Sequence, residues 1–245
     1  MGKEIALIEI SNLHKTFGDH KVLEGVTLKV KSGENLVILG RSGSGKSVTI
    51  KCLVGLVQAD KGNIKVFGTN IKALNEHDLN KIRVRVGFMF QNGALYDSMS
   101  VRQNLIFTLK HHTKDISKDD IEQKVTEALE NVGLLEAIDK MPSELSGGMR
   151  KRIGMARTLI IKPEIILYDE PTSGLDTITA REISELILSI QKKFKTTSIV
   201  ITHDMACAKL TGDRIMILKD GIINAEGTYA ALKKSNDPWV RSFFV

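Results

Sequence analysis

The sequence predicts an α/β fold with a mainly parallel sheet, and three observations carry this prediction. Short apolar runs alternate with stretches of helical spacing, a glycine-rich turn joins one run to a helix, and the block 92–157 lacks strand-like runs. Strands that alternate with helices favour a parallel sheet covered on both faces. We therefore expect a single domain whose sheet core spans 1–91 and 158–245, with 92–157 inserted as an α-helical lobe.

The N-terminal third predicts an antiparallel β region followed by the first strand of the main sheet. Apolar runs at 5–10, 22–30 and 35–40 predict strands, because turn residues separate them. A buried helix is predicted at 47–57, directly after the glycine-rich turn. A strand pair at 62–68, a helix at 76–85 and a strand at 86–90 complete this part.

Helical spacing dominates the middle of the chain, and strand signals return after it. The predicted helices of the lobe are 101–109, 121–132 and 148–160, with a polar surface loop at 111–118. The later elements are listed in chain order: strand 165–167, helix 177–193, strands 199–202, 214–218 and 222–226, and a short helix 229–234. This order continues the alternation expected of a parallel sheet.

Composition indicates an ordinary globular protein. The chain has 245 residues, of which 42% are hydrophobic and 26% charged, which disfavours disorder and fibrous structure. No apolar stretch approaches the roughly 18 residues of a membrane-spanning helix. The first ten residues include Glu4 and Glu9 and offer no small-residue cleavage site, so a cytoplasmic location is expected.

Charge and cysteine content exclude little by themselves. The formal net charge of +6 suits a nucleic acid, a nucleotide or an anionic membrane face, and does not choose among them. Cys52 and Cys207 have no nearby cysteine or histidine partners, so we expect two buried thiols instead of a disulfide or a zinc site.

The strongest functional signal is a phosphate-binding loop between a strand and a helix. The residues that match G-x-x-x-x-G-K-[ST] are Gly40, Arg41, Ser42, Gly43, Ser44, Gly45, Lys46 and Ser47. Glycines permit positive φ and let backbone N–H groups surround a polyphosphate. Lys46 is expected to bind the outer phosphates and Ser47 to ligate Mg²⁺, with the helix N-terminus adding partial positive charge.

Ionisable side chains follow two later strands of the predicted sheet. Asp169 and Glu170 end the apolar run that starts at Ile165, and His203 follows the strand at 199–202. Ligands of such sheets bind at the carboxyl ends of the strands. We expect Asp169 to hold Mg²⁺ through water and Glu170 to polarise the attacking water. A lone histidine is more often structural, but His203 can reach the same edge.

A second candidate anion site lies in the predicted lobe. Ser146 is a good N-cap, Gly147 and Gly148 leave the backbone open, and three basic residues follow at 150–152. An isolated Ser-Gly-Gly is more often an ordinary capped helix, so this segment alone leaves both interpretations open.

The order of these segments resembles the ATP-binding subunit of ABC transporters over nearly the whole chain. The matching segments are Phe17, the Walker A loop 40–47, Gln91, the signature 145–149, the Walker B strand 165–170, the D-loop 173–176 and His203. The resemblance implies a P-loop NTPase (RecA-like) core that binds ATP and Mg²⁺ and hydrolyses ATP. It also implies a head-to-tail homodimer attached to an integral membrane permease.

The same resemblance assigns roles that no local pattern supplies. It implies that Phe17 stacks on adenine and that Gln91 ligates Mg²⁺ and reports the nucleotide state to the permease. It also implies that Asp176 of the D-loop takes part in binding the nucleotide. Ser146, Gly147 and Gly148 of one subunit would complete the ATP site built on Lys46 of the other. His203 would be the switch histidine beside the catalytic Glu170.

Two residues depart from the family pattern. Phe17 stands where tyrosine is usual, which keeps the stacking ring and loses a hydroxyl. Met149 stands where the signature usually has glutamine, which removes a polar contact near the nucleotide. We expect ATPase activity to survive both.

Three segments are similar to the ATPases of Mla/Mce-type phospholipid transporters: 91–101, the signature Leu-Ser-Gly-Gly-Met-Arg-Lys-Arg, and Asp-Pro-Trp-Val-Arg at 237–241. This similarity implies phospholipid transport between membranes, with a lipid-binding protein and a small cytosolic regulator as further partners. The chain would sit on the inner face of the cell membrane through its permease.

Other functions stay open at this point. The ATPase of another importer, for amino acids or metal complexes, and a cell-division relative share the same motifs. A nucleic-acid-linked ABC ATPase fits the basic balance, but the chain lacks the coiled-coil insert and cysteine pairs of repair proteins, so no nucleic-acid partner is expected. A nucleotide-binding regulator without turnover would differ by the absence of phosphate release.

Overall fold

The computed structural model describes residues 6–113 and 116–244 and contains two β-sheets. The larger has six strands in the order β10-β9-β3-β8-β7-β6. Their bounds are β3 Asn35–Leu39, β6 Val86–Met89, β7 Ile165–Asp169, β8 Thr197–Thr202, β9 Arg214–Lys219 and β10 Ile222–Gly227. All neighbours pair in parallel except β10, which is antiparallel to β9. The predicted α/β class with a mainly parallel sheet is confirmed.

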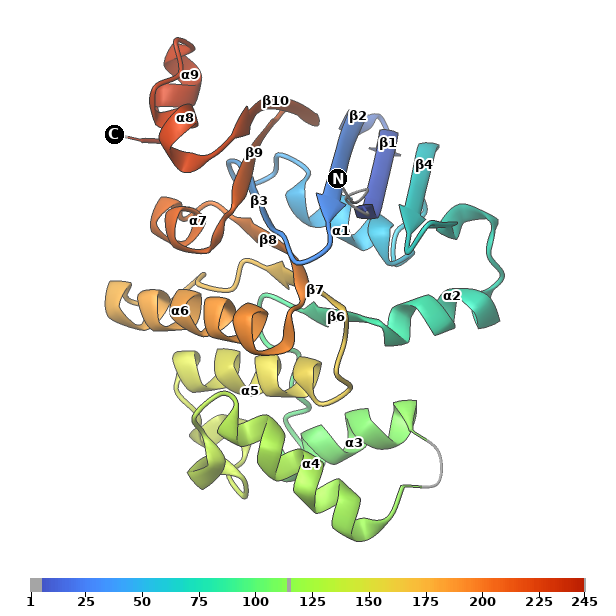
Figure 1. The fold of residues 1–245 in the computed structure, drawn as a ribbon, viewed down its shortest axis with the longest axis vertical. Helices are drawn as coiled ribbons and strands as arrows, with labels where there is room; N and C mark the ends of the chain where they lie inside the picture. Colours follow the sequence, from blue (N-terminus) through green and yellow to red (C-terminus); the bar gives the residue numbers. More distant parts are fainter. Residues whose placement is uncertain (1–5, 114–115, 245) are drawn as a thin grey trace, which may run out of the picture.

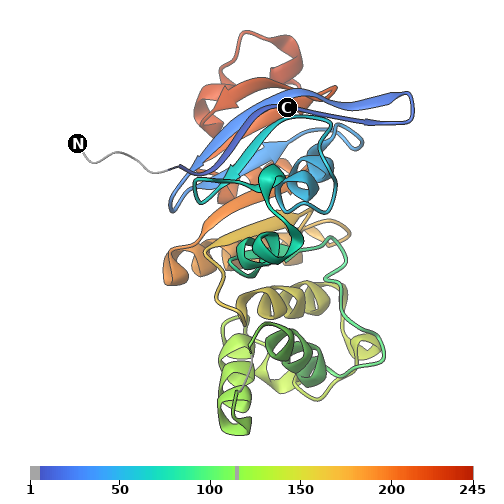
Figure 2. The ribbon, with the colours of Figure 1, turned by 90° about the vertical axis from the view of Figure 1, so that its right-hand side faces the viewer.

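The smaller sheet is the antiparallel region predicted near the N-terminus. It contains β1 Ala6–Phe17, β2 His20–Lys31, β4 Lys61–Val66 and β5 Thr69–Asn70 in the order β2-β1-β4-β5. The β1–β2 hairpin forms a long ribbon that crosses the upper part of the molecule, below the C-terminal segment (Figure 2). β1 runs well beyond the predicted end at residue 10 because β2 and β4 pair with it on both sides. Residue 5 of the predicted strand lies outside the described residues.

Side chains of the central strands alternate between two hydrophobic clusters. Leu36 and Ile38 of β3 belong to the cluster beneath the smaller sheet and α1, and Val37 and Leu39 belong to the cluster on the helical side. β7 and β8 alternate in the same way. Successive residues of a strand point to opposite faces, so continuous apolar runs fill both clusters at once.

The helices lie on both faces of the larger sheet and below it (Figure 1). Their bounds are α1 Lys46–Leu53, α2 Glu76–Val84, α3 Val101–His112, α4 Lys118–Glu130, α5 Gly147–Leu159, α6 Thr177–Phe194, α7 Met205–Thr211, α8 Tyr229–Lys233 and α9 Pro238–Arg241. Helix α1 is shorter than predicted because the chain turns at Gly55, whose φ is +70°. The short helices α7 and α9 were not predicted.

The lobe consists of α3, α4 and the start of α5, together with 3₁₀ turns at Leu135–Ala137 and Pro142–Glu144. One hydrophobic cluster joins it to the sheet without interruption, because it includes Val101 and Leu105 of the lobe as well as Ile166 of β7. The boundaries at 92 and 157 therefore stay a prediction. Of the polar loop predicted at 111–118, residues 111–112 end α3, residue 118 begins α4, and 114–115 lie outside the described residues.

Three strands end together at the edge where the candidate site lies. Leu39 of β3 pairs with Thr202 of β8, and Asp169 of β7 pairs with Ile201. The residues that follow these strands are Gly40, His203 and Glu170, so the parallel register gathers the predicted site residues at one sheet edge.

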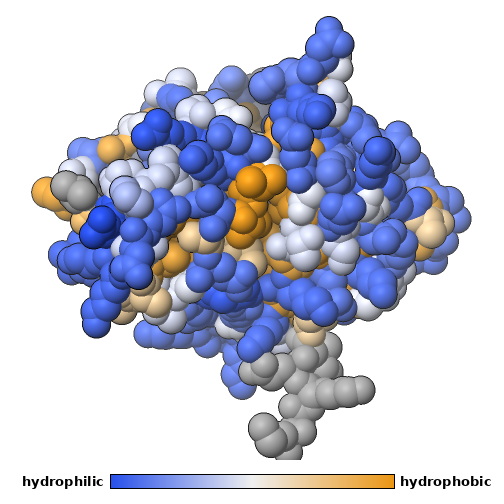
Figure 3. Space-filling view, turned by 90° about the horizontal axis from the view of Figure 1, so that it is seen from above, coloured by the Kyte–Doolittle hydropathy of each residue, from blue (hydrophilic) through white to orange (hydrophobic). Residues whose placement is uncertain are grey.

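None of the helices within 6–113 and 116–244 is long and apolar enough to cross a membrane. The upper side of the molecule is mostly hydrophilic around a small central apolar area (Figure 3). Cys52 and Cys207 are buried free thiols, as predicted, and burial raises the pKa of each to about 11. Both are therefore protonated near neutral pH, which makes them poor nucleophiles.

Candidate nucleotide site

The glycine-rich turn between β3 and α1 has the backbone that a phosphate loop requires. Gly43 and Gly45 have φ values of +80° and +100°, which favour glycine. A Cβ at Gly40 would lie 2.6 Å from the Leu218 carbonyl oxygen, and one at Gly45 would lie 2.7 Å from the Val22 carbonyl oxygen. A positive φ or a close backbone contact therefore requires glycine at each of these positions. The motif spacing in the sequence does not reveal which of the two applies.

Lys46 begins α1 and is buried, with its side chain 4% exposed. Its ammonium donates hydrogen bonds to the carbonyl oxygens of Gly40 at 2.8 Å and Arg41 at 3.0 Å, and lies 3.4 Å from a Glu170 carboxylate oxygen. The loop therefore folds around a positive charge. An incoming polyphosphate can exchange for these acceptors because it offers charged oxygens in place of neutral carbonyls.

Ser47 and Asp169 lie together as the predicted magnesium ligands should. The Ser47 hydroxyl donates to Asp169 Oδ1 at 2.7 Å, although 122 positions separate them along the chain. A hydroxyl and a carboxylate are oxygen ligands of the kind that Mg²⁺ prefers, and Mg²⁺ needs few protein ligands when phosphates supply the rest. No group of three His, Cys, Asp or Glu side chains among the described residues suggests another metal site. The donor set thus fits Mg²⁺, which would neutralise phosphate charge when bound.

Glu170 follows β7 with a positive φ of +50°, which is uncommon for a residue with a side chain. Its carboxylate contacts His203 Nδ1 at 2.8 Å through Oε2 and faces Lys46 through Oε1. The Glu170 amide donates to the Ile201 carbonyl at 2.9 Å, which fixes the turn against β8. The strand end thus presents a carboxylate between a fixed cation and a histidine.

A cavity of about 700 Å³ contains most of the predicted nucleotide contacts. The lining residues are Phe17, Val22, Gly40, Arg41, Ser42, Gly43, Gly45, Lys46, Ser47, Val48, Gln91, Glu170, His203 and Phe243. Phe17 is 49% exposed, so its ring is open to a ligand. Ser44 is absent from this lining, and its hydroxyl is buried. Asp169 joins the site through Ser47.

Phe243 is a lining residue that the sequence did not suggest. It lies after α9, more than 200 positions from Phe17, and its ring packs edge-on against Trp239 at a centroid distance of 4.9 Å. An aromatic ring just after the segment 237–241 singled out in the sequence therefore lines the nucleotide cavity, packed against Trp239 of that segment. Only the fold could show this, because no periodicity links the tail to the glycine-rich turn.

Gln91 lies at the cavity wall just after β6. Its amide nitrogen donates to the Ser173 hydroxyl at 3.0 Å, and its backbone carbonyl accepts from the Lys151 ammonium. Gln91 and the predicted D-loop 173–176 are therefore in direct contact. The role of Gln91 as a magnesium ligand stays a prediction.

Ser146 caps α5, accepting a hydrogen bond from the Met149 amide at 3.3 Å. Ser146 and Gly147 are exposed, and a Cβ at Gly148 would lie 2.5 Å from Thr179 Cγ2, so close packing against α6 requires glycine there. None of the described residues that line the cavity belongs to this signature segment. Within the part of the chain that the structure describes, the signature segment therefore lies outside the wall of this cavity.

Asp176 caps α6 through hydrogen bonds from the Ile178 and Thr179 amides, both at 3.0 Å. A further hydrogen bond from the Thr179 hydroxyl and these amides hold the pKa of this carboxyl below its ordinary value. In the isolated chain Asp176 is thus occupied in capping, and it does not line the cavity. Its predicted D-loop role stays a prediction.

The loop, the buried lysine and the strand-end carboxylates define a P-loop nucleoside triphosphatase. The family model described as ABC transporter matches residues 23–173, more than half of the chain. The chain belongs to the ABC transporter ATP-binding family, and it is an ATPase that binds ATP and uses Mg²⁺.

Curated relatives match nearly the whole chain. The probable ribonucleotide transport ATP-binding protein mkl of Mycobacterium leprae (strain TN) is 41% identical over 96% of this chain and 68% of its own length. Protein TRIGALACTOSYLDIACYLGLYCEROL 3, chloroplastic, of Arabidopsis thaliana is 37% identical over 97% and 73%. The methionine import ATP-binding protein MetN of Clostridium tetani (strain Massachusetts / E88) is 41% identical over 90% and 69%. The chain thus spans about two thirds to three quarters of these relatives.

A solved structure shows the same fold. The ATP-binding cassette MJ0796, a dimer in a post-hydrolysis state bound to ADP and Pi, superposes with a TM-score of 0.83 at 31% identity. The superposition covers 90% of this chain and 98% of that one. The predicted P-loop NTPase architecture is confirmed at this level.

Proposed function

We propose that this chain hydrolyses ATP to drive phospholipid transport between membranes, as a homodimer beneath an integral membrane permease on the inner face of the cell membrane. The observation that carries the energy-supplying role is the convergence of Lys46, the Ser47–Asp169 pair and Glu170 on one cavity. Such a site binds a polyphosphate and places a carboxylate where it can activate the water that attacks the γ-phosphate.

The lipid assignment rests on similarity in three segments and on the name of one relative. Segments 91–101, 145–152 and 237–241 are similar to those of Mla/Mce-type phospholipid transporters. One relative carries the name of a galactolipid, although another is named for ribonucleotide transport. A lipid-binding protein and a small cytosolic regulator would complete the assembly.

A groove beside Gln91 supports docking to a permease. The cavity, of about 560 Å³, lies between β6 and the helical lobe. Its walls include Phe88, Phe90, Leu95 and Tyr96, and the rings of Phe90 and Tyr96 are more than a third exposed. An apolar groove with aromatic walls suits a helix of a partner protein. Phe90 lines this groove and Gln91, the next residue, lines the nucleotide cavity, so a partner helix bound in the groove can shift the position of Gln91.

The homodimer is supported by the position of the signature. Ser146 and Gly147 are exposed at a helix N-terminus, where backbone N–H groups favour anions, yet they do not line the cavity of their own chain. A second copy arranged head to tail would place this terminus against the γ-phosphate. ATP would then favour closure by binding both surfaces, and hydrolysis would release it.

Substituting Ser146→Arg is expected to leave ATP binding to the monomer within about twofold and to lower dimer turnover about a hundredfold, the scale of removing an anion-stabilising donor. Nucleotide titration and phosphate release measure the two effects. Ser189→Arg, at an exposed position of α6, is the matched control and should turn over normally.

Mixed dimers test whether this defect acts across the interface. A Ser146→Arg subunit paired with a Lys46→Ala subunit would place both defects in one site and leave the other complete. Such a dimer should therefore trap one nucleotide. If it traps none, the signature acts within its own chain and the head-to-tail arrangement is wrong.

A second candidate is the ATPase of another importer, which the similarity to a methionine importer favours. Purification of the native complex, with identification of every bound protein and lipid, separates the two functions. Co-purified phospholipid with a lipid-binding protein supports the lipid assignment. A solute-binding protein in its place would overturn that assignment and leave the ATPase role intact.

The remaining alternatives have their own tests. Binding to duplex DNA that weakens with salt and stimulates ATP hydrolysis would support a nucleic-acid-linked ATPase. An intact complex that binds ATP but releases no phosphate would support a regulator without turnover.

A further inference from the structure

Lys151 is a buried cation in α5, and its hydrogen bonds within the described residues go to backbone carbonyls. The residue is 6% exposed, and its ammonium donates to two backbone carbonyls, those of Gln91 and of Glu170, the latter at 3.0 Å. Burial lowers the pKa of this ammonium, and the negative charges of Glu170 and Asp169 act in the opposite direction. Burying a charge costs free energy unless hydrogen bonds compensate, and here the two carbonyls supply them.

The two carbonyls belong to a closed ring of hydrogen bonds, which we call the Lys151 ring. Lys151 contacts the Gln91 carbonyl, and the Gln91 amide contacts the Ser173 hydroxyl at 3.0 Å. The Ser173 backbone N–H donates to the Glu170 carbonyl at 3.2 Å, and the same carbonyl accepts from Lys151. One ammonium therefore joins the segments that follow β6 and β7 to the helix that carries the signature.

The Lys151 ring holds the backbone of Glu170, the carboxylate that we propose activates water. The backbone of Glu170 has a φ of +50°, which persists only where the surroundings hold it. The Ile201 carbonyl holds its amide, and Lys151 and Ser173 hold its carbonyl. Rotation of this peptide would turn the carboxylate away from Lys46 and His203.

A direct contact between Lys151 and nucleotide does not fit the geometry. Lys151 is absent from the described residues that line the nucleotide cavity, and its ammonium lies on the backbone side of Glu170. Any effect on hydrolysis must therefore pass through Glu170 and Gln91.

We propose that Lys151 is a positioning residue for ATP hydrolysis, which fixes the backbone of Glu170 and Gln91 and couples the signature helix to the water-activating carboxylate. Because Lys151 comes from α5 and its acceptors come from the sheet core, movement of the lobe strains or relaxes this ring. The role of Lys151 rests on that of Glu170 in the proposed mechanism.

The test compares Lys151→Met and Lys151→Arg in the full chain, with ATPase kinetics measured at saturating Mg²⁺. Methionine keeps the volume and removes the donor, so kcat should fall about tenfold or more while KM for ATP stays within about twofold. Arginine restores the donors and should recover kcat to within about threefold of the wild type.

Two controls separate this role from general destabilisation and from a failure of the mechanism. Arg214→Met removes a partly buried cation that binds Glu34, Glu226 and the Lys29 carbonyl, far from the cavity. It should lower Tm without lowering kcat. Glu170→Gln, measured alongside, shows whether Glu170 is essential. If Glu170→Gln is inactive and Lys151→Met is not, only the role of Lys151 is overturned.

If Lys151→Met does not fold, a double-mutant cycle of Lys151→Gln with Ser173→Ala tests the positioning role instead. Lys151→Gln has a shorter side chain whose amide can still donate to one of the two buried carbonyls, so it should fold where methionine leaves both without a donor. Since both substitutions open the same ring, their effects on kcat should not add. Additive effects, a wild-type kcat in Lys151→Met, or a loss confined to KM would each overturn the proposal.

Discussion

Replacing Glu170 by glutamine should slow ATP hydrolysis about a hundredfold to ten-thousandfold, the range that a positioned general base supplies. Glutamine keeps the shape of the side chain but cannot accept a proton from water at neutral pH. Its oxygen can still accept a hydrogen bond from His203, whose Nδ1 lies 2.8 Å from Glu170 Oε2 in the wild-type structure. Steady-state phosphate release measures the loss.

ATP binding should survive the same change, and the closed dimer should accumulate. The Glu170 carboxylate lies 3.4 Å from the Lys46 ammonium, so it competes with the phosphates for that cation and repels them. Removing its charge therefore favours bound ATP. Because closure is released by hydrolysis in the proposed cycle, ATP should convert this variant into a stable dimer visible by gel filtration.

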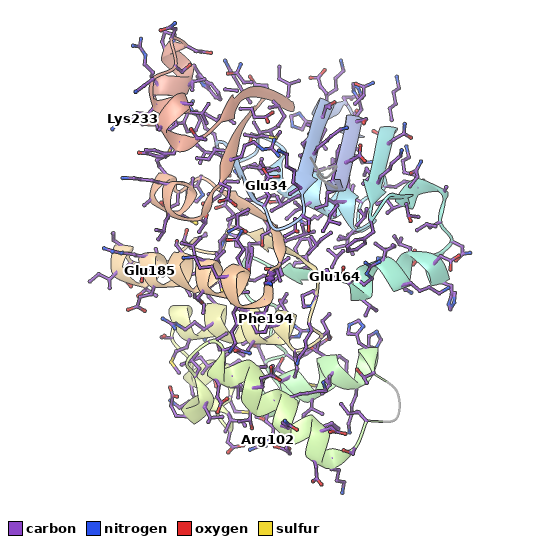
Figure 4. The ribbon with its side chains drawn as sticks, in the orientation of Figure 1. Glu34, Arg102, Glu164, Glu185, Phe194 and Lys233 are labelled. Carbon is purple, nitrogen blue, oxygen red and sulfur yellow. The ribbon has the colours of Figure 1, made fainter. Side chains whose placement is uncertain are left out.

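The chain offers a matched control at the other end of the same strand. Glu164, labelled in Figure 4, directly precedes β7, as Glu170 directly follows it. Its carboxylate forms an ion pair with Arg85 at 2.6 Å. Glu164→Gln should leave turnover unchanged and reduce the free energy of unfolding by at most about 1 kcal/mol. Normal turnover in Glu170→Gln would show that another group activates water.

The parts of the site that the sequence predicts are those set by local backbone or by sheet topology. The glycine-rich turn is local, because its residues are neighbours along the chain and positive φ values explain the glycines. Asp169 and His203 lie far apart in sequence, but Asp169 ends one parallel strand and His203 follows another, and such strands end at one edge. Local glycine geometry thus predicts the phosphate loop, and the common edge of the parallel strands predicts that the carboxylates lie beside it.

The contacts that the sequence does not predict depend on how distant segments pack. Lys151 looks like one of three solvated basic residues after the signature, yet the turn of α5 buries it against two carbonyls. Phe243 belongs to a tail whose direction no motif specifies. β1 extends beyond its apolar run because two neighbouring strands satisfy its backbone, which periodicity within one segment cannot reveal.

Replacing Lys46 by alanine should weaken ATP binding by about thirtyfold or more. A hydrogen bond to a charged group contributes about 2 kcal/mol or more, which corresponds to this change in affinity. The Lys46 ammonium is already buried and oriented by the carbonyls of Gly40 and Arg41, so little order is lost when phosphate replaces them. Titration with a fluorescent ATP analogue measures the change.

Comparing the affinities for ATP and AMP distinguishes loss of the Lys46 charge from unfolding of the phosphate loop. The lysine of this motif reaches the β- and γ-phosphates, so Lys46→Ala should weaken ATP strongly and AMP hardly at all. Lys51→Ala, in the last turn of the same helix and outside the cavity lining, should bind both nucleotides normally. Equal losses for ATP and AMP would instead indicate that Lys46 supports the fold of the loop through its carbonyl contacts. Unchanged ATP affinity would remove this residue from the phosphate site altogether, because no other buried ammonium lines the described part of the cavity.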